Sequence, residues 1–270
     1  MIRKRFGQNF LTDRGALRRI ADALELLPTD TVVEIGPGRG ALTDELVDRC
    51  ARLEAIEIDR DLVAHLRERY RERSHVTIHE GDVLDIDVGA LARGPYVLAG
   101  NVPYYVTTPI IFHSLRAPRP IRSVFLVQRE VAERLVAVEG SREYGALTVN
   151  VRLVADVDVV GAVGRGAFHP RPNVDSAIVR LRPRTDAPVV GDEDALRRFV
   201  IGCFGQRRRQ LPRAIRTVTG LDAVAAAGVV GAVALDPLRR PEDLSPAEFA
   251  ALWAAVARAL PNDRGSTARS

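Results

Sequence analysis

The sequence has few cysteines and no long run of apolar residues. Cys50 and Cys203, the only two cysteines among 270 residues, are too few for a disulfide framework, and no Cys-x-x-Cys pair of the zinc-ribbon kind is present. No apolar segment approaches the roughly 18–20 residues that a membrane span requires, and none follows the basic N-terminus as in a signal peptide. These absences argue against secreted, membrane-spanning and zinc-ribbon proteins and predict a cytoplasmic one.

Lysine is nearly absent as well, because Lys4 is the single lysine and the other 38 of the 39 basic residues are arginines. The formal net charge is +4 and the isoelectric point is about 9.5, a balance often seen in proteins that bind nucleic acid. Local clustering is more informative, since residues 203–219 contain five arginines and no acid. Either this face is simply solvated or it contacts phosphates, and we predict phosphate contacts. The predicted residues are Arg3, Lys4, Arg5, Arg207, Arg208, Arg209 and Arg213, with Arg216 in the same cluster.

Short β-branched runs alternate with amphipathic helical patterns over the first half of the chain. The patterns predict strands at 31–36, 53–58, 76–79, 96–99 and 123–127, and helices at 14–27, 41–50, 60–73, 107–115 and 130–138. Such alternation predicts an α/β fold with a doubly wound, mostly parallel sheet. Two later strands, 156–163 and 176–182, have no long helix between them and predict an antiparallel hairpin at the sheet edge.

The last third of the chain has helical patterns only. The segment 183–192 contains two prolines and a glycine and is typical of a linker, and helical spacing follows at 194–204, 211–219, 221–227 and 246–260. We therefore predict two domains, with residues 1–187 forming the sheet domain and residues 188–270 a small helical domain.

A glycine-rich loop at residues 36–40 follows the first predicted strand, where glycine lets the backbone approach a nucleotide closely. Glu57 ends the next strand and can accept hydrogen bonds from ribose hydroxyls, and Asp82 after the third strand can hold the amine of an adenine. Three interpretations compete: an S-adenosylmethionine site, a dinucleotide site and a tight turn without ligand. Glu34, two residues before the loop, would repel a phosphate and attract a cationic sulfonium, which favours S-adenosylmethionine.

The segment Asn101-Val102-Pro103-Tyr104 follows the fourth strand. In folds of this class, ligands bind beyond the carboxyl ends of the strands. An adenine amine is a poor nucleophile, because its lone pair is delocalised into the ring. The side-chain oxygen of Asn101 and a backbone carbonyl of Val102 or Pro103 could accept hydrogen bonds from such an amine, and Tyr104 offers a face for stacking. The bland alternative is a turn that merely ends a strand. This chemistry needs no metal, and the five histidines form no evident ligand pair.

Taken together, these motifs give the chain a resemblance to the bacterial small-subunit ribosomal RNA adenine dimethyltransferases. It rests on collinear segments spread over nearly the whole chain: Arg3–Leu11, Glu34–Thr43, Glu57–Asp59, Gly81–Asp82, Gly100–Tyr104, Gln128–Val131, Tyr144–Gly145, Phe168–Ser176 and Phe204–Arg209. One departure is Val102, where leucine or isoleucine is commoner, and since the residue stays aliphatic we expect little consequence.

The resemblance implies a Rossmann-like S-adenosylmethionine-dependent methyltransferase sheet with a small C-terminal all-helical domain. It implies that six residues bind the cofactor: Asn9, Leu11, Gly36, Glu57, Asp82 and Asn101. It also implies that Asn101 lies between the donor and the target adenine, that Tyr104 stacks on the adenine and that Phe168 closes its other face. The implied substrate is a pair of adjacent adenosines in a hairpin loop near the 3′ end of 16S rRNA, in the assembling small subunit. Each adenosine receives two methyl groups at N6, and we expect a monomeric enzyme with no metal and no membrane partner.

Two alternatives remain open at this point. The large-subunit adenine methyltransferases of the macrolide-resistance type share the N-terminal and glycine-loop motifs. Tyr104, where those enzymes often have phenylalanine, and the segment 204–209 favour the small-subunit family. The second alternative is a ribosome-assembly factor that acts mainly by binding.

Overall fold

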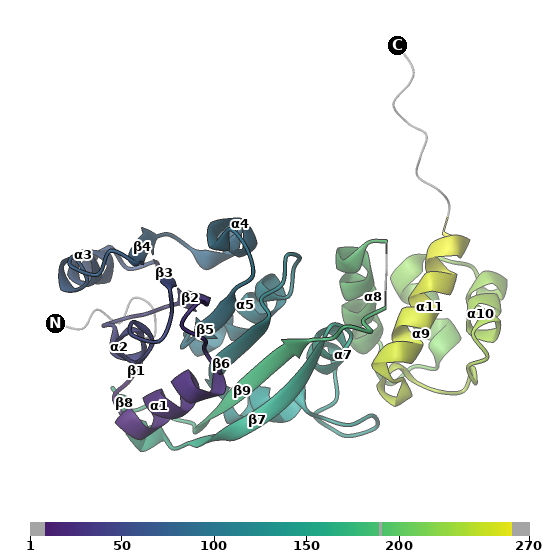
Figure 1. Ribbon diagram of the computed structural model, residues 1–270. Coiled ribbons are helices and arrows are strands. Elements are labelled where there is room, and N and C mark those ends of the chain that lie inside the picture. The colour runs from purple at the N-terminus through teal and green to yellow at the C-terminus, as the bar shows by residue number, and fades with distance from the viewer. Residues whose placement is uncertain (1–8, 189–190, 261–270) are drawn as a thin grey trace, which may run out of the picture. The chain divides into compact units, whose positions relative to one another are not determined.

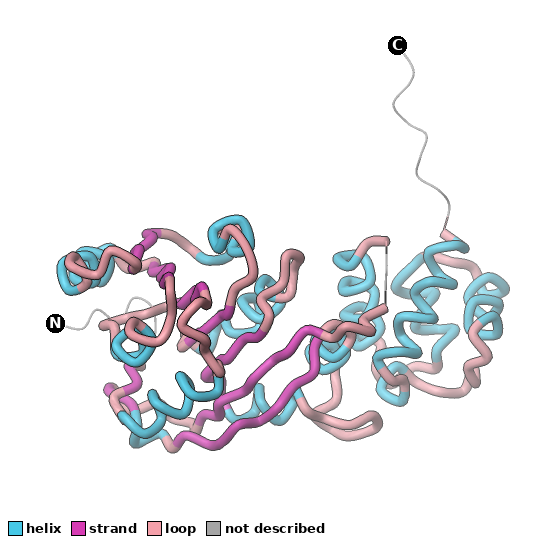
Figure 2. The backbone as a smooth tube through the Cα atoms, viewed as in Figure 1, coloured by secondary structure: helices cyan, strands magenta, loops and turns pink. Residues whose placement is uncertain are grey.

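The computed structural model describes residues 9–188 and 191–260. The chain divides into two compact units, the first formed by Met1–Val136 with Ala155–Arg184 and the second by Ala137–Val154 with Thr185–Ser270. Strands occur only in the first unit, and the described residues of the second contain helices and loops (Figure 2).

The first unit is built on a seven-stranded sheet of order β4-β3-β2-β5-β6-β9-β7 (Figure 1). Five neighbouring strands pair in parallel, and β9 and β7 add antiparallel at one edge, as predicted. The strands are β2 (Thr31–Ile35), β3 (Arg52–Glu57), β4 (Val76–Glu80), β5 (Val97–Gly100), β6 (Arg122–Gln128), β7 (Ala155–Val163) and β9 (Ser176–Pro183).

Helices cover both faces of this sheet. Leu17, Ile20 and Leu24 recur at helical spacing in the first helix and its C-cap, and pack with Val32 and Leu53 in one core. Strand residues of the opposite face are fully buried as well. The helices of this unit are α1 (Arg14–Ala23), α2 (Ala41–Leu46), α3 (Arg60–Arg69), α4 (Val88–Ala92), α5 (Thr107–Ser114) and α6 (Arg129–Leu135), with short 3₁₀ turns η2 (Val83–Asp85), η3 (Tyr104–Val106) and η4 (Arg165–Ala167).

A second, two-stranded sheet joins distant parts of the sequence. Strand β1 (Phe10–Leu11) pairs antiparallel with β8 (Phe168–His169), so that Leu11 lies opposite Phe168. The backbone N–H of Thr12 also donates to the carbonyl of Ala167 at 2.8 Å. Strands of two residues are too short for periodicity to reveal, and the sequence analysis did not predict them.

The second unit packs its helices around a separate core. Its helices are α7 (Ala146–Arg152), α8 (Glu193–Gly205), α9 (Leu211–Thr219), α10 (Ala223–Ala232) and α11 (Pro246–Ala259), with the 3₁₀ turn η5 (Pro241–Asp243). Phe199, Phe249 and Val256 are buried in this core. In the described part of the chain no helix is by itself long and apolar enough to span a membrane; α9 and α10 pass such a test only as a pair, bent by 119°.

The division into units differs from the predicted domains at residues 137–154 and at residues 185–187. Residues 137–154 belong to the second unit, whereas we predicted a sheet domain spanning 1–187. The reason is packing: Val149 and Leu153 lie in the helical core, and the hydroxyl of Tyr144 donates to the carbonyl of Leu244 at 2.6 Å. A linear pattern shows that these residues are apolar but not which core they enter.

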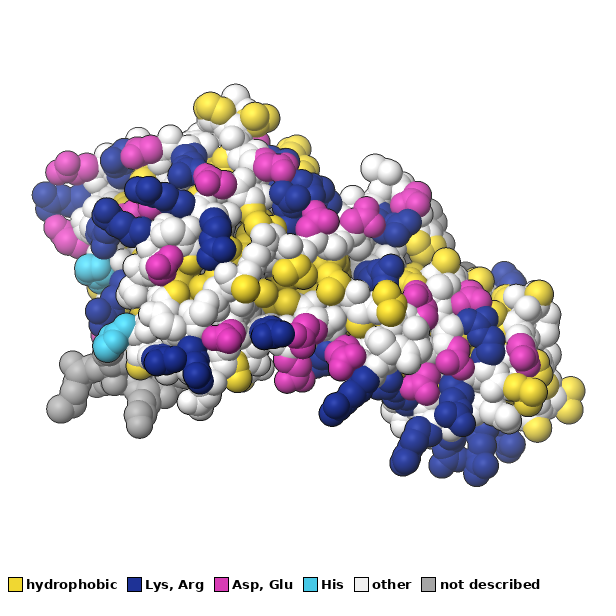
Figure 3. All heavy atoms as spheres, turned by 90° about the horizontal axis from the view of Figure 1, so that it is seen from below, with side chains coloured by type: hydrophobic (Ala, Val, Ile, Leu, Met, Phe, Trp, Pro, Cys, Tyr) yellow, Lys and Arg dark blue, Asp and Glu magenta, His cyan; other side chains and the backbone are white. Residues whose placement is uncertain are grey.

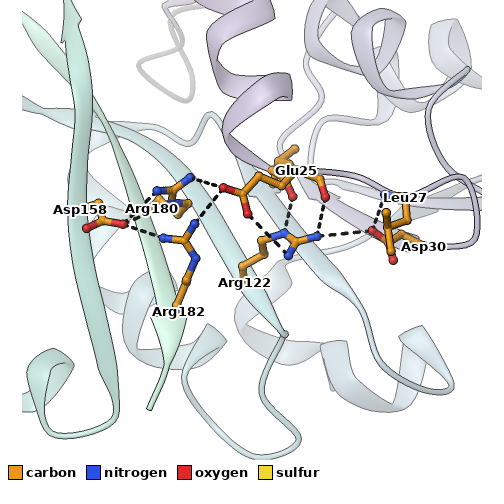
Figure 4. Close-up of polar contacts among 8 residues, drawn as sticks. Glu25, Leu27, Asp30, Arg122, Asp158, Arg180 and Arg182 are labelled. Atoms are coloured by element: carbon orange, nitrogen blue, oxygen red, sulfur yellow. Dashed lines mark hydrogen bonds and ion pairs between the residues drawn. The ribbon is translucent and has the colours of Figure 1, made fainter. Parts of the chain in front are cut away.

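An ion-pair network fastens the end of α1 to the sheet (Figure 4). One carboxylate oxygen of Glu25 accepts from Arg180 at 2.8 Å and from Arg182 at 2.9 Å, and both guanidinium groups also reach Asp158. The side chain of Arg122 donates to the carbonyl of Glu25 at 2.6 Å. Because one anion serves cations from two segments, the network couples α1 to β6 and β9.

We expect Glu25→Gln to lower the free energy of unfolding by about 1 kcal/mol, since the change leaves Arg180 and Arg182 sharing Asp158 alone. The measurement is urea unfolding at low and high salt, and the loss should shrink as salt screens the charges. Glu68→Gln is the matched control, because Glu68 is 73% exposed and its bridge to Arg71 lies wholly on the surface. An equal loss in both variants would contradict a special role for the network.

Candidate active site

One cavity lies at the carboxyl ends of β2, β3 and β5. It opens to solvent, and about 1300 Å³ of space lies between protein atoms when its mouth is included. The residues around it include all those predicted for the cofactor and for catalysis: Asn9, Leu11, Gly36, Glu57, Asp82, Asn101, Tyr104 and Phe168. The fold thus brings together side chains that are up to 159 positions apart in the sequence.

The glycine loop follows β2 and starts the wall of this cavity. Gly36 has φ +67°, and a Cβ there would stand 3.4 Å from the carbonyl oxygen of Asn101. Gly40 has φ +85°, and a Cβ there would lie 2.6 Å from the hydroxyl oxygen of Tyr70. Gly36 therefore requires glycine for its backbone conformation, and Gly40 for its conformation and for the close approach of Tyr70. The loop and Asn101 start level with each other because Ile35 pairs with Gly100.

Glu57 lies at the end of β3, is 3% exposed and supports the glycine loop through hydrogen bonds. Its carboxylate accepts backbone N–H groups of Gly38, Ile58 and Asp59, each at 3.0 Å. Burial raises the pKa of Glu57, and these three hydrogen bonds oppose the shift. A carboxylate has about four acceptor positions, so about one remains for a ligand. The sequence analysis predicted the ligand role but not the bracing role.

Asp82 follows β4 and also lines the cavity. Its Oδ1 accepts the backbone N–H of Leu84 at 2.9 Å and so caps the turn η2. This bond orients the carboxylate through Oδ1, and the other oxygen, Oδ2, can still accept a hydrogen bond.

The segment after β5 forms the third wall. The hydroxyls of Tyr104 and Ser176 share a hydrogen bond of 2.6 Å, which holds the tyrosine ring, and burial raises the pKa of Tyr104. The carbonyl of Pro103 accepts from the N–H of Val106 at 3.1 Å and from the hydroxyl of Thr107 at 3.3 Å. Of the two carbonyls considered from the sequence, that of Val102 is therefore the better acceptor for a substrate amine.

Phe168 and Leu11 are 5% and 2% exposed. Both belong to the sheet core and both line the cavity, so Phe168 packs in the core and also borders the space open to a ligand. The pairing of β1 with β8 fixes their positions.

Glu34 is the residue that the sequence analysis weighed but did not include among the site residues. It lines the cavity with 1% of its surface exposed, and Oε2 accepts the hydroxyl of Thr43 at 2.7 Å. Burial raises the pKa of Glu34 to about 8; the Thr43 bond opposes the shift, and the charges of Glu57 and Asp44 add to it. No ion pair to Glu34 is found among residues 9–188 and 191–260, so a cationic ligand would meet an uncompensated acid.

The raised pKa predicts how the stability of the ligand-free protein depends on pH. A folded-state pKa above the ordinary 4.5 means that the folded protein holds the proton more tightly. The resulting stabilisation is complete below about pH 4.5 and is lost as pH rises through about 8. Glutamine does not titrate, so the Glu34→Gln variant avoids this loss. We expect its free energy of unfolding, relative to that of the unaltered protein, to be higher at about pH 8 than at pH 5 by on the order of a few kcal/mol.

Urea unfolding at the two pH values measures this difference. Glutamine stays neutral and its amide oxygen can still accept the Thr43 hydroxyl, so packing is retained. Glu68→Gln, on the exposed surface of α3, serves as the control. The same effect of Glu34→Gln at both pH values would refute the assignment.

The predicted basic cluster falls in three groups. Arg3, Lys4 and Arg5 lie outside the described residues. Arg207 is engaged within the second unit, where its guanidinium bonds Glu242 and donates to the carbonyls of Arg142 at 2.9 Å and Ser141 at 2.8 Å. By contrast, the following side chains are exposed and have no ion pair with any described residue: Arg208, Arg209, Arg213 and Arg216. Arginine side chains gather along one edge of the second unit in Figure 3.

Comparison with known proteins decides the family. The family model described as "Ribosomal RNA adenine dimethylase" matches residues 1–251. The chain belongs to this family. The resemblance inferred from the motifs is confirmed, and the chain is an rRNA adenine dimethyltransferase. In the described residues no group of three or more His, Cys, Asp or Glu side chains could hold a metal ion.

Curated relatives of this dimethyltransferase match over nearly their full length. A "Ribosomal RNA small subunit methyltransferase A" of Aromatoleum aromaticum is 41% identical over 96% of each chain. The protein of the same name from Chromohalobacter salexigens is 43% identical, over 96% of this chain and 93% of the relative.

Solved structures confirm the Rossmann-like methyltransferase fold with a helical C-terminal region. A dimethyladenosine transferase from Plasmodium falciparum gives a TM-score of 0.80 at 25% identity, over 93% of this chain and 98% of the other. The 23S rRNA methyltransferase ErmE gives a TM-score of 0.68 at 28% identity, over 92% and 100%.

Proposed function

We propose that this dimethyltransferase moves methyl groups from S-adenosylmethionine to N6 of two adjacent adenosines in a hairpin loop near the 3′ end of 16S rRNA. The substrate is the assembling small ribosomal subunit, which places the activity in the cytoplasm. The observation that carries the proposal is that Asn101 and Tyr104 line the same cavity as Gly36, Glu57 and Asp82. A donor and an acceptor of the methyl group can therefore be held side by side.

The cavity fits S-adenosylmethionine in charge and in shape. Glu34 and Glu57 are buried acids beside the loop. A bound cation favours their charged form, whereas the phosphates of a dinucleotide would be repelled by it. The glycine loop leaves room against Asn101 that a Cβ at Gly36 would fill. When bound, the cofactor supplies a methyl group already activated on a sulfonium, so the protein has mainly to position the reactants.

The residues at the end of β5 perform the positioning. The Asn101 side-chain oxygen and the Val102 carbonyl accept hydrogen bonds from the two N6 hydrogens, which turns the nitrogen lone pair away from the ring and toward the donor. Tyr104, held by Ser176, stacks on one face of the adenine, and Phe168 closes the other. The methylated amine loses its proton readily afterwards, so no strong base is required. A loop adenosine is partly unstacked already, which lowers the cost of extruding it.

The small-subunit substrate is favoured over the large-subunit alternative. The curated relatives at 41–43% identity carry small-subunit names. Chemistry at the amine is the same in both enzymes, so the RNA surface has to make the distinction.

We expect Asn101→Ala to lower the methyl transfer rate at least about 100-fold, because the amine loses an acceptor that orients it. Transfer of labelled methyl groups to unmethylated small subunits measures the rate. Calorimetry with S-adenosylmethionine and a subunit-binding assay serve as controls, and subunit binding should stay near that of the unaltered protein. Full activity in the variant would refute the site, whereas loss of subunit binding would favour a role mainly in assembly.

We expect simultaneous replacement of Arg208, Arg209 and Arg213 by Gln to weaken subunit binding and to flatten its salt dependence. Each phosphate contact adds about 0.7–0.9 to the slope of log K against log salt, so the slope should fall by about 2. The matched control replaces Arg60, Arg71 and Arg73 by Gln, which changes the net charge by the same amount. These three arginines pair with acids of the first unit. An unchanged slope in the first variant, or an equal fall in the control, would reject the assignment.

A further inference from the structure

Tyr105 is an exposed aromatic at the mouth of the cavity. It lines the cavity, yet 67% of its surface is open to solvent. In the part of the chain that the structure describes, it is the one aromatic among the exposed large hydrophobic side chains. No hydrogen bond, ion pair or ring contact of its side chain with another described residue is found. A large apolar ring beside a ligand cavity, without a partner in the protein, is available to an incoming ring.

The turn that carries Tyr105 is held on both sides. The Pro103 carbonyl accepts from Val106 and Thr107, and Tyr104 is tied to Ser176. The three residues Tyr104–Val106 form the 3₁₀ turn η3, in which successive side chains point about 120° apart. Tyr104 is half-buried and Tyr105 exposed, so the two neighbouring rings face different surroundings from one rigid support.

We propose that the ring of Tyr105 stacks on the nucleobase adjacent to the adenine that occupies the cavity, and so positions the RNA strand for both methylations. This inference rests on the proposed function. When one base is extruded, its neighbour loses a stacking partner, and a preformed aromatic ring at the mouth replaces it. Because the two tyrosines are consecutive, with Cα atoms about 3.8 Å apart, two consecutive bases can be contacted from one turn.

The test compares the unaltered protein with Tyr105→Ala, Tyr105→Phe and Tyr105→Leu on unmethylated small subunits. We expect Tyr105→Ala to raise KM for the subunit about tenfold, with the affinity for S-adenosylmethionine unchanged. Mass spectrometry of the rRNA should show a larger fraction modified at one adenosine only. Phenylalanine should restore both properties and leucine should not, since stacking requires a ring. Ile121→Ala, at another exposed apolar side chain of the first unit, is the control.

Each other outcome overturns a defined part of the account. Normal KM and normal double modification in Tyr105→Ala would refute the stacking role while leaving the proposed function intact. Rescue by leucine would show that apolar bulk, not stacking, matters, and an equal loss of cofactor affinity would assign Tyr105 to the donor site; both refute the inference. If the unaltered protein fails to methylate the small-subunit RNA, the proposed function falls and this inference falls with it.

Discussion

The parallel pairing of β2 with β5 is the constraint on which the site depends. It sets Ile35 beside Gly100, so the glycine loop and the Asn101 segment leave the sheet at the same level and touch. A Cβ at Gly36 would come within 3.4 Å of the Asn101 carbonyl. Strand register therefore sets where the glycine loop begins relative to Asn101, and hydrogen bonds and burial on both faces of the sheet make that register costly to shift.

Buried acids set the electrostatics of the cavity. The carboxylate of Glu57 accepts hydrogen bonds from three backbone N–H groups and so holds the loop that would surround a cofactor. Glu34 has only the hydroxyl of Thr43 as a described hydrogen-bond partner, and its pKa is raised to about 8 by burial. Near neutral pH Glu34 is therefore mostly protonated before a ligand binds. A cation that binds beside it favours release of the proton, and the resulting charge pair is screened by little solvent. Burying these acids costs free energy, which reduces the stability of the folded protein before any ligand binds.

The aromatic side chains at the cavity differ in burial and therefore in how rigidly they are held. Phe168 is part of the core, and Tyr104 is half-buried and tied to Ser176, so both are rigid. Tyr105 stands at the mouth with most of its surface exposed. Rigid rings inside and an open ring outside suit a strand that inserts one base and leaves the next at the surface. The arginines of the second unit show a similar division, since Arg207 supports the unit while Arg208 and Arg209 face solvent.

The sequence alone determined the α/β order, the glycine loop and the motif residues at the ends of the strands. These are encoded locally, in β-branched runs, helical spacing and short motifs such as residues 36–40 and 101–104. Tertiary structure alone decided which distant segments meet. The pairing of Leu11 with Phe168 and the ion pair of Arg207 with Glu242 each join residues at least 35 positions apart. The place of residues 137–154 depends on which core their apolar side chains enter. Local propensity carries no information on such contacts, because their free energy arises only when the chain has folded.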